Sequence, residues 1–452
     1  MQQGEEHRDT AAMRPRTLRI EGGHPLRGEV AAAGAKNAAP KQFVASLMSE
    51  EPCVFRNVPA IAEIDVVLAM LGELGTTFET TADHGLEIHT RRLVANRIGE
   101  RYQGVNRIPV LLIAPLLHRL GAATVPAVGG CRLGSRPIDF HLSALQAMGA
   151  EITVGEREVE ARAPRDGLRG TTVRLPYPSV GATENTLLAA VLARGTTVID
   201  NAAIEPEVLD TILFLQKMGA LIGFDADRRI VIDGVPCLRG TEHHVVADRM
   251  EVASYALAAI ATGGRVSVRH ARQDHLVSFL TVLRRLGGTF QVDEAGITFS
   301  RDDATMRAVQ VETGVHPGFM TDWQQPLVAA LTRADGVSVV HETVFEDRFG
   351  YTDQLRAMGA SIELSPTCMG PRPCRFDGGR HLHSCRVTGP TRLRPGQLTA
   401  PDLRGGVACV LAALMAGGTS EVHRLELIER GYSNLPRNLA ALGAAVEVTG
   451  AG

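Results

Sequence analysis

The stretch LQAMGAEITV, Leu145 to Val154, contains the pattern that decides the fold. Apolar residues at helical spacing lead up to Gly149, and apolar and polar residues alternate after it. A glycine at this point is typical of a left-handed helix C-cap, and the alternation is typical of a strand. The stretch therefore predicts a helix that ends at a glycine and continues directly into a strand.

This helix–glycine–strand pattern occurs six times along the chain. The other copies are LGELGTTFE at Gly75, LQKMGALIGF at Gly219, LRRLGGTFQV at Gly287, LRAMGASIEL at Gly359 and LAALGAAVEV at Gly443. Successive glycines are 74, 70, 68, 72 and 84 residues apart, which matches none of the common solenoid periods. The spacing indicates six copies of one larger structural unit.

Each unit also contains a second helix with polar residues in its first turn. These helices are expected near KNAAPKQFVASL from Lys36, NRIPVLLIAPLL from Asn106, TENTLLAAVLA from Thr183, DRMEVASYALAAI from Asp248, TDWQQPLVAAL from Thr321 and PDLRGGVACVLAAL from Pro401. Small apolar residues fill the remainder of each segment, which predicts a buried helix with its start at a cleft. A strand such as GTTVID, Gly195 to Asp200, follows. The unit is helix, strand, helix, strand, and two groups of three units predict two similar α/β domains.

Composition narrows the class of protein. The 452 residues are 44% hydrophobic, enough for more than one core, and the formal charge is −3. This charge argues against nucleic acid as a partner. Apolar runs such as VLLIAPLL, Val110 to Leu117, are shorter than the ~18 residues of a membrane span. Met1 to Pro15 is polar and is expected to be a loose tail. We expect a cytoplasmic protein that does not bind membranes.

Seven cysteines are scattered along the chain, which favours free thiols over a disulfide framework. One group, Cys368, Cys374, His381, His383 and Cys385, has the residue types of a zinc site. It contains no CxxC pair and its spacing is irregular, so we interpret it as a surface insertion without a metal. The sequence contains neither GxxxxGK[ST] nor a convincing dinucleotide fingerprint, so no cofactor is expected.

Charged residues gather at the predicted helix starts. They are Lys36, Arg107, Asp248, Arg249, Asp322 and Arg404, with Asn37 beside the first. Helix N-termini favour anions, and basic side chains strengthen that preference. A lone cation at a helix start is usually a solvated surface charge, and Asp322 or Asp402 could be an ordinary N-cap. Recurrence at equivalent points of the repeat favours a ligand with several negative charges.

The loop VGGCRLGSRPIDFHL, Val128 to Leu142, places Cys131 among three glycines and two arginines. A thiol held for packing belongs in an apolar element, although an inert loop thiol is the ordinary alternative. Arg132 and Arg136 would favour the thiolate of Cys131. The loop therefore looks functional.

Eight collinear motifs carry a resemblance to a known family. They are GAKNAAPK (Gly34 to Lys41), GGCRLGSRPIDFHL (Gly129 to Leu142), PSVGATEN (Pro178 to Asn185), NAAIEPEVLD (Asn201 to Asp210), FMTDWQQP (Phe319 to Pro326), ETVFEDRFG (Glu342 to Gly350), PDLRGG (Pro401 to Gly406) and ERGYSNL (Glu429 to Leu435). From about Leu18 to the C-terminus the chain resembles the UDP-N-acetylglucosamine 1-carboxyvinyltransferases, which are enolpyruvyl transferases, and most closely their actinomycete form.

The resemblance implies two inside-out α/β barrel domains, each of three repeated units, around an active-site cleft. One domain is expected over residues 36–246 and carries the Cys131 loop, and the second over 16–35 plus 247–452. The implied reaction moves enolpyruvyl from phosphoenolpyruvate to the 3'-hydroxyl of UDP-N-acetylglucosamine and releases phosphate. This is the first committed step of peptidoglycan synthesis, and so serves cell-wall biogenesis, cell shape and division. The partners are these two small molecules, and we expect a monomer that fosfomycin inhibits.

Residue roles follow from the same resemblance. Cys131, Asp322, Lys36 and Arg404 match catalytic residues, with Cys131 as the acid and covalent nucleophile and Asp322 as the base. Lys36, Arg136 and Arg430 match the ligands of the phosphate of phosphoenolpyruvate, and Arg348 and Arg404 those of its carboxylate. Arg107 matches a further active-site arginine. The expected contacts to the nucleotide sugar are Asn37, Arg136, Pro137, Ile138, Asp139, Phe140, His141, Ser179, Val180, Gly181 and Val344.

Two departures and two alternatives stay open. The region from Cys368 to Thr391 is longer than in the commonest bacterial forms, and Tyr177 stands where many members carry a lysine near the diphosphate. The acceptor could instead be UMP, as in related enzymes of nucleoside-antibiotic pathways. A catalytically inactive regulator that binds nucleotide sugar is the alternative from another class of protein.

Overall fold

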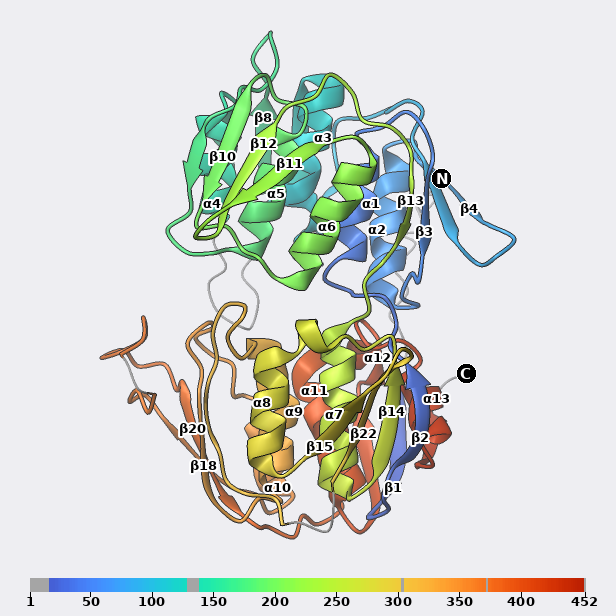
Figure 1. The fold of residues 1–452 in the computed structure, drawn as a ribbon, viewed down its shortest axis with the longest axis vertical. Helices are drawn as coiled ribbons and strands as arrows, with labels where there is room; N and C mark the ends of the chain where they lie inside the picture. The colour runs from blue at the N-terminus through green and yellow to red at the C-terminus, as the bar shows by residue number, and fades with distance from the viewer. Residues whose placement is uncertain (1–15, 128–137, 302–304, 371–372, 451–452) are drawn as a thin grey trace, which may run out of the picture.

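A computed structural model describes residues 16–127, 138–301, 305–370 and 373–450. It has two lobes, one above the other in Figure 1. Buried apolar residues form one cluster between Ala35 and Val245. A second cluster joins Leu18 to Ala32 with the chain from Met250 to Ala444. The expected two-domain α/β fold is confirmed, and the bounds given above for the two domains stay a prediction. The predicted tail, residues 1–15, lies outside the described residues.

The first lobe contains three helix–strand units. The first consists of α1 (Ala39–Ser46), β3 (Cys53–Arg56), α2 (Ala62–Glu73), β4 (Thr77–Thr80) and β5 (Leu86–His89), with the short helix η1 (Glu100–Tyr102) after it. The second consists of α3 (Ile108–Leu120), β6 (Ala122–Pro126), α4 (Asp139–Ala147), β7 (Glu151–Val154), β8 (Glu158–Arg162) and β9 (Thr172–Arg174). The third consists of α5 (Val180–Ala190), β10 (Thr196–Asp200), α6 (Pro206–Lys217), β11 (Leu221–Asp225), β12 (Arg229–Asp233) and β13 (Glu242–His244).

The second lobe repeats this arrangement. Its first unit consists of α7 (Arg249–Thr262), β14 (Arg265–Arg269), η2 (Gln273–His275), α8 (Val277–Leu286), β15 (Thr289–Val292), β16 (Gly296–Ser300) and β17 (Gln310–Glu312). The next consists of η3 (Thr321–Trp323), α9 (Gln324–Leu331), β18 (Gly336–His341), α10 (Thr352–Ala357), β19 (Ser361–Ser365), β20 (Ser384–Gly389) and β21 (Gln397–Thr399). The last consists of α11 (Leu403–Met415), β22 (Gly418–His423), α12 (Leu425–Ile428), α13 (Leu435–Ala441) and β23 (Ala445–Thr449), and β1 (Thr17–Gly22) and β2 (Arg27–Ala31) join this lobe.

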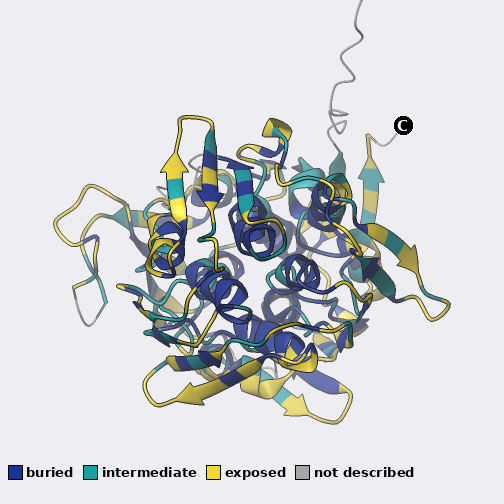
Figure 2. Ribbon diagram, turned by 90° about the horizontal axis from the view of Figure 1, so that it is seen from above, coloured by how far each residue is buried: buried dark blue, intermediate teal, exposed yellow. Residues whose placement is uncertain are grey.

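Helices occupy the centre of each lobe and the sheets lie outside them. Figure 2 shows the central helices in dark blue, whereas the outer strands carry teal and yellow segments. In α5 and α11 nearly every side chain is buried. This is expected for α11, which is almost entirely apolar, whereas α5 also buries the polar run Thr183 to Thr186. The predicted inside-out arrangement is therefore observed. Among the described residues no helix has the length and apolar character needed to cross a membrane.

The sheets are more elaborate than the predicted unit. In the order β11-β12-β10-β9, β12 pairs antiparallel with both β11 and β10, and the short β9 joins β10 in parallel. The order β19-β20-β18-β17 in the second lobe repeats the pattern. The sequence analysis predicted one strand on each side of the second helix. It missed the returning hairpin strand and the short parallel strand, which is only three residues long in β9 and β17.

The six glycines of the repeat have the predicted conformation. Their φ angles are positive, at 95° for Gly75, 98° for Gly149, 105° for Gly219, 102° for Gly287, 97° for Gly359 and 83° for Gly443. This left-handed region strains residues that have a Cβ atom. The glycine therefore ends each helix and directs the chain into the next strand.

The chain passes between the lobes twice, and the two crossings lie together. Gly34 pairs with Ala247 in an isolated antiparallel bridge. A Cβ atom on Gly34 would lie 1.8 Å from the carbonyl oxygen of Asn57, so only glycine fits this crossing. β2 pairs in parallel with β14, and β1 lies between β22 and β23. The first lobe is thus inserted within the sequence of the second.

Candidate active site

Asp322 lies between two of the predicted arginines. Its Oδ2 atom accepts a hydrogen bond from Nε of Arg404 over 3.1 Å, and its Oδ1 atom accepts one from Nη2 of Arg348. The three residues come from η3, the segment before α10 and the first turn of α11. Asp402 is the N-cap of α11 and accepts from the amides of Arg404 and Gly405, whereas the N-cap residues of η3 and α9 are Met320 and Trp323. The N-cap alternative therefore holds for Asp402 but not for Asp322.

Arg404 is buried and only partly satisfied. It is 4% exposed, its guanidinium lies 5.3 Å from the ring centroid of Tyr432, and its Nη1 atom is buried without a hydrogen-bond partner. Burial lowers the pKa of Arg404, but Tyr432, Asp322 and Asp248 outweigh this effect and raise it overall. A buried guanidinium that stays charged and has a vacant donor is suited to hold an anion. Arg348, 5% exposed, adds a second buried cation.

Lys36 and Arg430 meet at an acidic residue that the sequence analysis did not identify. Oε2 of Glu63 accepts from Nη2 of Arg430 over 3.0 Å, and its Oε1 lies 3.9 Å from Nζ of Lys36. Burial lowers the pKa of Lys36, Glu63 opposes that shift, and the charges of Arg404 and Arg430 add to it. Arg404 and Arg430 thus both act electrostatically on Lys36. Glu63 begins an ordinary amphipathic helix, α2, so no sequence signal singled it out.

His141 lies beside the start of α5 in the first lobe. A Cβ atom on Gly181 would be 2.9 Å from Cε1 of His141, so the two predicted residues are in contact. Burial, followed by the charge of Arg107, lowers the pKa of His141 to about 3. His141 is therefore a neutral ring, and its Nδ1 atom is buried without a hydrogen-bond partner. A neutral ring can donate a hydrogen bond to a ligand or accept one from it.

The other predicted nucleotide contacts lie at the starts of α4 and α5, just before α1, and after β18 in the second lobe. Ser179 caps α5 by accepting from the amide of Ala182 over 3.3 Å, and Val180 and Gly181 form its first turn. Ile138, Asp139 and Phe140 begin α4, where Asp139 is exposed. The carbonyl of Asn37 accepts from Lys41, and the amide of Val344 donates to Glu342 over 2.8 Å. Cys131, Arg136 and Pro137 lie outside the described residues.

A buried ion pair joins the two lobes beside this region. Nε and Nη2 of Arg249 each donate to one carboxylate oxygen of Glu207 over 2.9 Å. Both residues are 2% exposed, and the guanidinium lies 5.3 Å from the ring centroid of Trp323, next to Asp322. The sequence analysis noted Arg249 as a basic helix start. In the structure its partner is Glu207 of α6, so its role is to connect α6 to α7.

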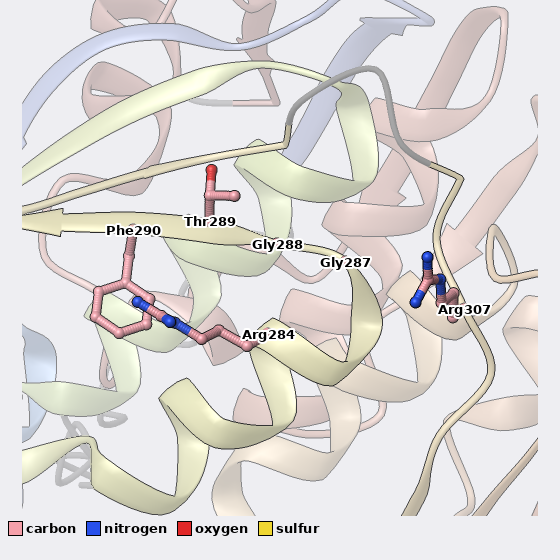
Figure 3. Close-up of a pocket in the computed structure, with 6 residues that line it drawn as sticks. All are labelled: Arg284, Gly287, Gly288, Thr289, Phe290 and Arg307. Carbon is pink, nitrogen blue, oxygen red and sulfur yellow. The ribbon is translucent and has the colours of Figure 1, made fainter.

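The hollow in Figure 3 lies elsewhere. It has a volume of about 380 Å³ and is formed where α8 ends and β15 begins, around Gly287 and Gly288. Arg284 and Arg307 contribute guanidinium groups, and Arg284 lies 4.5 Å from the ring centroid of Phe290. Its lining contains none of the predicted site residues, so the cleft that the sequence predicts at the helix starts stays a prediction.

Residues 20–439 match the family model described as EPSP synthase (3-phosphoshikimate 1-carboxyvinyltransferase). The chain belongs to the EPSP synthase family. Within this family it is 48% identical over 436 residues to the UDP-N-acetylglucosamine 1-carboxyvinyltransferase of Protochlamydia amoebophila, an alignment that covers 95% of this chain and 94% of the relative. It is 44% identical over 432 residues to the enzyme of the same name from Chlamydia muridarum, covering 95% of this chain and 98% of that one.

A solved structure agrees with this assignment at the level of the fold. The enolpyruvyl transferase NikO from Streptomyces tendae superposes with a TM-score of 0.84 at 23% sequence identity, covering 97% of this chain and 100% of that chain. The family resemblance predicted from the motifs is therefore confirmed. Both sequence relatives are chlamydial, so the expected likeness to the actinomycete form of the family stays a prediction.

Proposed function

We propose that this protein transfers the enolpyruvyl group of phosphoenolpyruvate to the 3'-hydroxyl of UDP-N-acetylglucosamine and releases phosphate. It is an enzyme of the enolpyruvyl transferase family, and relatives at 44–48% identity over 95% of the chain bear the name of this activity. These relatives favour the nucleotide sugar over UMP as acceptor, and they favour an enzyme over an inactive regulator. The step belongs to peptidoglycan synthesis.

One observation in the structure carries the proposal. The carboxylate of Asp322 accepts from two buried arginines, and one of these, Arg404, has a further nitrogen atom without a partner. An incoming carboxylate could bind Nη1 of Arg404 and compete with Asp322 for the rest of the guanidinium. Planar guanidinium groups bind carboxylates through paired hydrogen bonds. We therefore assign Arg348 and Arg404 to the carboxylate of phosphoenolpyruvate.

The reaction needs three proton transfers. A proton adds to the methylene carbon of phosphoenolpyruvate while the 3'-hydroxyl attacks the neighbouring carbon and loses its own proton. The C–O bond to phosphate then breaks, and the methyl group gives up a proton to regenerate the double bond. We propose Asp322 as the base for the hydroxyl, because a carboxylate released from two arginines becomes free to accept a proton.

The phosphate of phosphoenolpyruvate leaves with additional negative charge. Lys36 and Arg430 share Glu63 and lie within electrostatic reach of Arg404, so we assign them to this phosphate. Cations fixed where charge develops lower the barrier of such a step. Arg136 is proposed for the same phosphate, and Cys131 is proposed as the acid that protonates the methylene carbon. Both lie outside the described residues, and their assignments rest on the sequence motif.

The nucleotide sugar is proposed to bind where the two lobes meet. In the first lobe the proposed contacts are Arg107, His141 and the start of α5, together with Asn37, which follows Lys36 directly in the sequence. Val344 follows β18 in the second lobe. A neutral His141 beside the N-terminus of α5 suits the uridine and diphosphate of such a ligand. We also propose a cytoplasmic monomer whose partners are these small-molecule substrates.

Phosphate release tests this function directly. The purified chain is incubated with phosphoenolpyruvate and either UDP-N-acetylglucosamine or UMP, and phosphate is measured over time. We expect release with the nucleotide sugar and little with UMP. A clear preference for UMP would favour the alternative function, enolpyruvyl transfer to UMP in nucleoside-antibiotic synthesis. Binding of the nucleotide sugar without phosphate release would favour the regulator.

A further inference from the structure

Four side chains with metal-binding atoms converge beside β18 and β20 in the second lobe. One ligand atom from each lies within 4.8 Å of every other: His341, Cys368, Cys374 and His383. His341 ends β18, and His383 immediately precedes β20, the antiparallel neighbour of β18 in Figure 1. The two cysteines come from the long loop between β19 and β20. Two strand ends and one loop therefore bring two imidazoles and two thiols to one point.

The distances between donor atoms match those around a tetrahedral ion. The two Sγ atoms are 3.5 Å apart, and Sγ of Cys368 is 3.4 Å from Nε2 of His383. Zinc bonds of about 2.3 Å to sulfur and about 2.0–2.1 Å to nitrogen place tetrahedral neighbours roughly 3.8 Å apart for S–S and roughly 3.5 Å for S–N. These two pairs differ from the tetrahedral spacing by only a few tenths of an ångström, and every other pair of donors lies within 4.8 Å.

The two histidines are oriented for metal binding. Nδ1 of His341 lies 3.0 Å from Oε2 of Glu312, and Nδ1 of His383 lies 2.8 Å from the carbonyl of His381. Both partners accept hydrogen bonds, so the proton is on Nδ1 and Nε2 keeps its lone pair. Nε2 of His341 is buried without a hydrogen-bond partner. Imidazoles that bind metals are held in this way by a carboxylate or a carbonyl behind them.

The thiols and their surroundings are also arranged for an ion. The amide of Cys374 donates to Sγ of Cys368, and the amide of Phe376 donates to Sγ of Cys374, each over 3.4 Å. These hydrogen bonds hold the two sulfur atoms in place beside the imidazoles. Gly370 packs against the histidine support, where a Cβ atom would lie 1.9 Å from Oε2 of Glu312 and 2.2 Å from Nδ1 of His341. A larger residue at 370 would displace this pair.

We propose that this chain binds one structural zinc ion through four side chains: His341, Cys368, Cys374 and His383. Two thiolates and two imidazoles in a closed tetrahedral set are the donors that zinc prefers. The sequence analysis interpreted this region as a metal-free insertion because its spacing is irregular. The group considered in the sequence left out His341, which is 27 residues before Cys368. It contained Cys385 instead, whose side chain is buried in the core of the lobe.

The ion would hold the loop against both lobes. Arg375 follows Cys374 directly, and its guanidinium donates to the carbonyl of Val344 and lies 3.7 Å from Glu346. The same group lies 5.6 Å from the ring centroid of Tyr177 in the first lobe. Arg375 is exposed and comes from a loop without regular structure. A zinc ion at Cys374 would therefore fix the position from which Arg375 makes these contacts.

Metal content of the full-length wild-type chain is the first test. The untagged protein is purified without added metal, dialysed against a weak chelator and analysed for zinc and protein together. We expect one zinc per chain. The metal-free protein, titrated with Co²⁺ alone under reducing conditions, should saturate at one equivalent and show the absorption of tetrahedral cobalt with thiolate-to-metal charge transfer. A spectrum of octahedral cobalt without the thiolate band would overturn the proposal.

Variants separate this site from adventitious binding. Cys368→Ser should lose the bound zinc, whereas Cys237→Ser, at an exposed cysteine, and His381→Gln, at a histidine of the same loop, should retain it. Glu312→Gln should keep the four ligands but weaken Zn²⁺ affinity by about 10- to 100-fold, since it alters only the support of His341. Equal zinc loss in the two control variants and Cys368→Ser would overturn the proposal.

The competing reading is a redox pair formed by Cys368 and Cys374. Non-reducing peptide mass spectrometry of the zinc-free wild-type chain distinguishes the two. In the zinc-free chain we expect both thiols to be reduced and open to alkylation. In the zinc-bound chain we expect both thiols to be protected from alkylation. A Cys368–Cys374 disulfide in a chain purified without zinc, or alkylation of both thiols as fast as Cys237 in the untreated protein, would contradict the zinc site. These measurements do not depend on transferase activity.

Discussion

Nε of Arg404 donates to Oδ2 of Asp322 over 3.1 Å, which connects α11 to the short helix before α9. The proposed base and a proposed substrate-binding arginine are therefore partners in the absence of a ligand. In the proposed mechanism a bound carboxylate replaces Asp322 on this guanidinium before Asp322 acts on the hydroxyl. We therefore propose that binding of the donor and activation of the acceptor are coupled through the hydrogen bonds of Asp322 to Arg404 and Arg348.

Asp322→Asn tests the proposed base. An amide still accepts from Arg404 but cannot take the proton of the hydroxyl, so we expect kcat to fall by about 10²- to 10⁴-fold with little change in nucleotide-sugar affinity. Steady-state kinetics and calorimetric binding measure the two effects. Asp402→Asn is the matched control, since asparagine caps a helix as well as aspartate. Similar losses of kcat in both variants would mean that Asp322 acts only through the helix start.

Arg404→Ala tests the anion site. Loss of one charged partner of a desolvated carboxylate costs about 2–5 kcal/mol, or roughly 30- to 5,000-fold in kcat/KM for phosphoenolpyruvate. A charge at a cleft-facing helix start is expected to contribute little to packing, but Arg404 is 4% exposed and faces the ring of Tyr432. Arg404→Lys, which keeps a charge, separates lost binding from lost packing. The exposed Arg437→Ala in α13 is the control, and a normal kcat/KM in both Arg404 variants would remove this residue from the site.

The Glu207–Arg249 pair should stabilise the junction of the lobes. Removal of either partner leaves a buried charge, so Glu207→Ala and Arg249→Ala should each lower the free energy of unfolding by about 3–5 kcal/mol. The double variant should lose less than the sum, because no charge is then left unpaired. Urea unfolding measures all four chains. Arg272→Ala at the exposed Arg272–Asp274 pair should change stability by less than about 0.5 kcal/mol, and additive losses at Glu207 and Arg249 would contradict their coupling.

His141 predicts a loss of stability in acid. The pKa of His141 is about 3 in the folded chain and 6.5 without the environment of the fold. Below pH 6.5 the unfolded chain therefore binds a proton that the folded chain does not. The free energy of unfolding therefore falls as the pH falls through this window, by roughly 1–2 kcal/mol between pH 6.5 and 5 for this group. Urea unfolding at both pH values should show a smaller decline in His141→Gln. An equal decline in variant and wild type would rule out a neutral, buried His141.

Fosfomycin, an epoxide phosphonate, tests the role assigned to Cys131 from its sequence motif. Its anionic group resembles the phosphate of phosphoenolpyruvate, so we expect selective alkylation of Cys131, faster with UDP-N-acetylglucosamine present. Peptide mass spectrometry locates the adduct. Cys131→Asp should resist the epoxide and keep some turnover, because a carboxylic acid can still deliver a proton, whereas Cys131→Ser should be far less active. Adducts spread over Cys368, Cys374 and Cys385, or full inhibition with Cys131 unmodified, would contradict the assignment.

The repeat made the fold predictable because each copy carries its own local signal. Gly149 and its five equivalents need a left-handed backbone, and this requirement is readable at a single position. The short parallel strands were missed because three residues such as Gln310–Glu312 carry no periodicity. Their pairing depends on a neighbouring strand that lies elsewhere in the sequence.

The candidate site was predictable at residues such as Lys36 and Arg404, because charged residues recur at equivalent helix starts of the repeat. Glu63 was not, because an acidic residue in the first turn of a helix is ordinary. Its role depends on Arg430, which is 367 residues away. The proposed metal site was not predicted for the same reason, since His341 and Cys374 meet only when β18 and β20 pair. Both sites depend on contacts between residues that are far apart in the sequence. A local sequence pattern carries no information about such contacts.

The position of β1 has a consequence for synthesis on the ribosome. β1 is made near the start of the chain, but its partners β22 and β23 are made near the end. At about 5–20 residues per second, β1 waits for roughly 20–80 s before β23 emerges, whereas the first lobe is complete once Val245 has been added. We expect the first lobe to fold during translation while β1 and β2 are still unpaired and accessible to chaperones. The synthesis of β22 and β23 therefore decides when β1 folds.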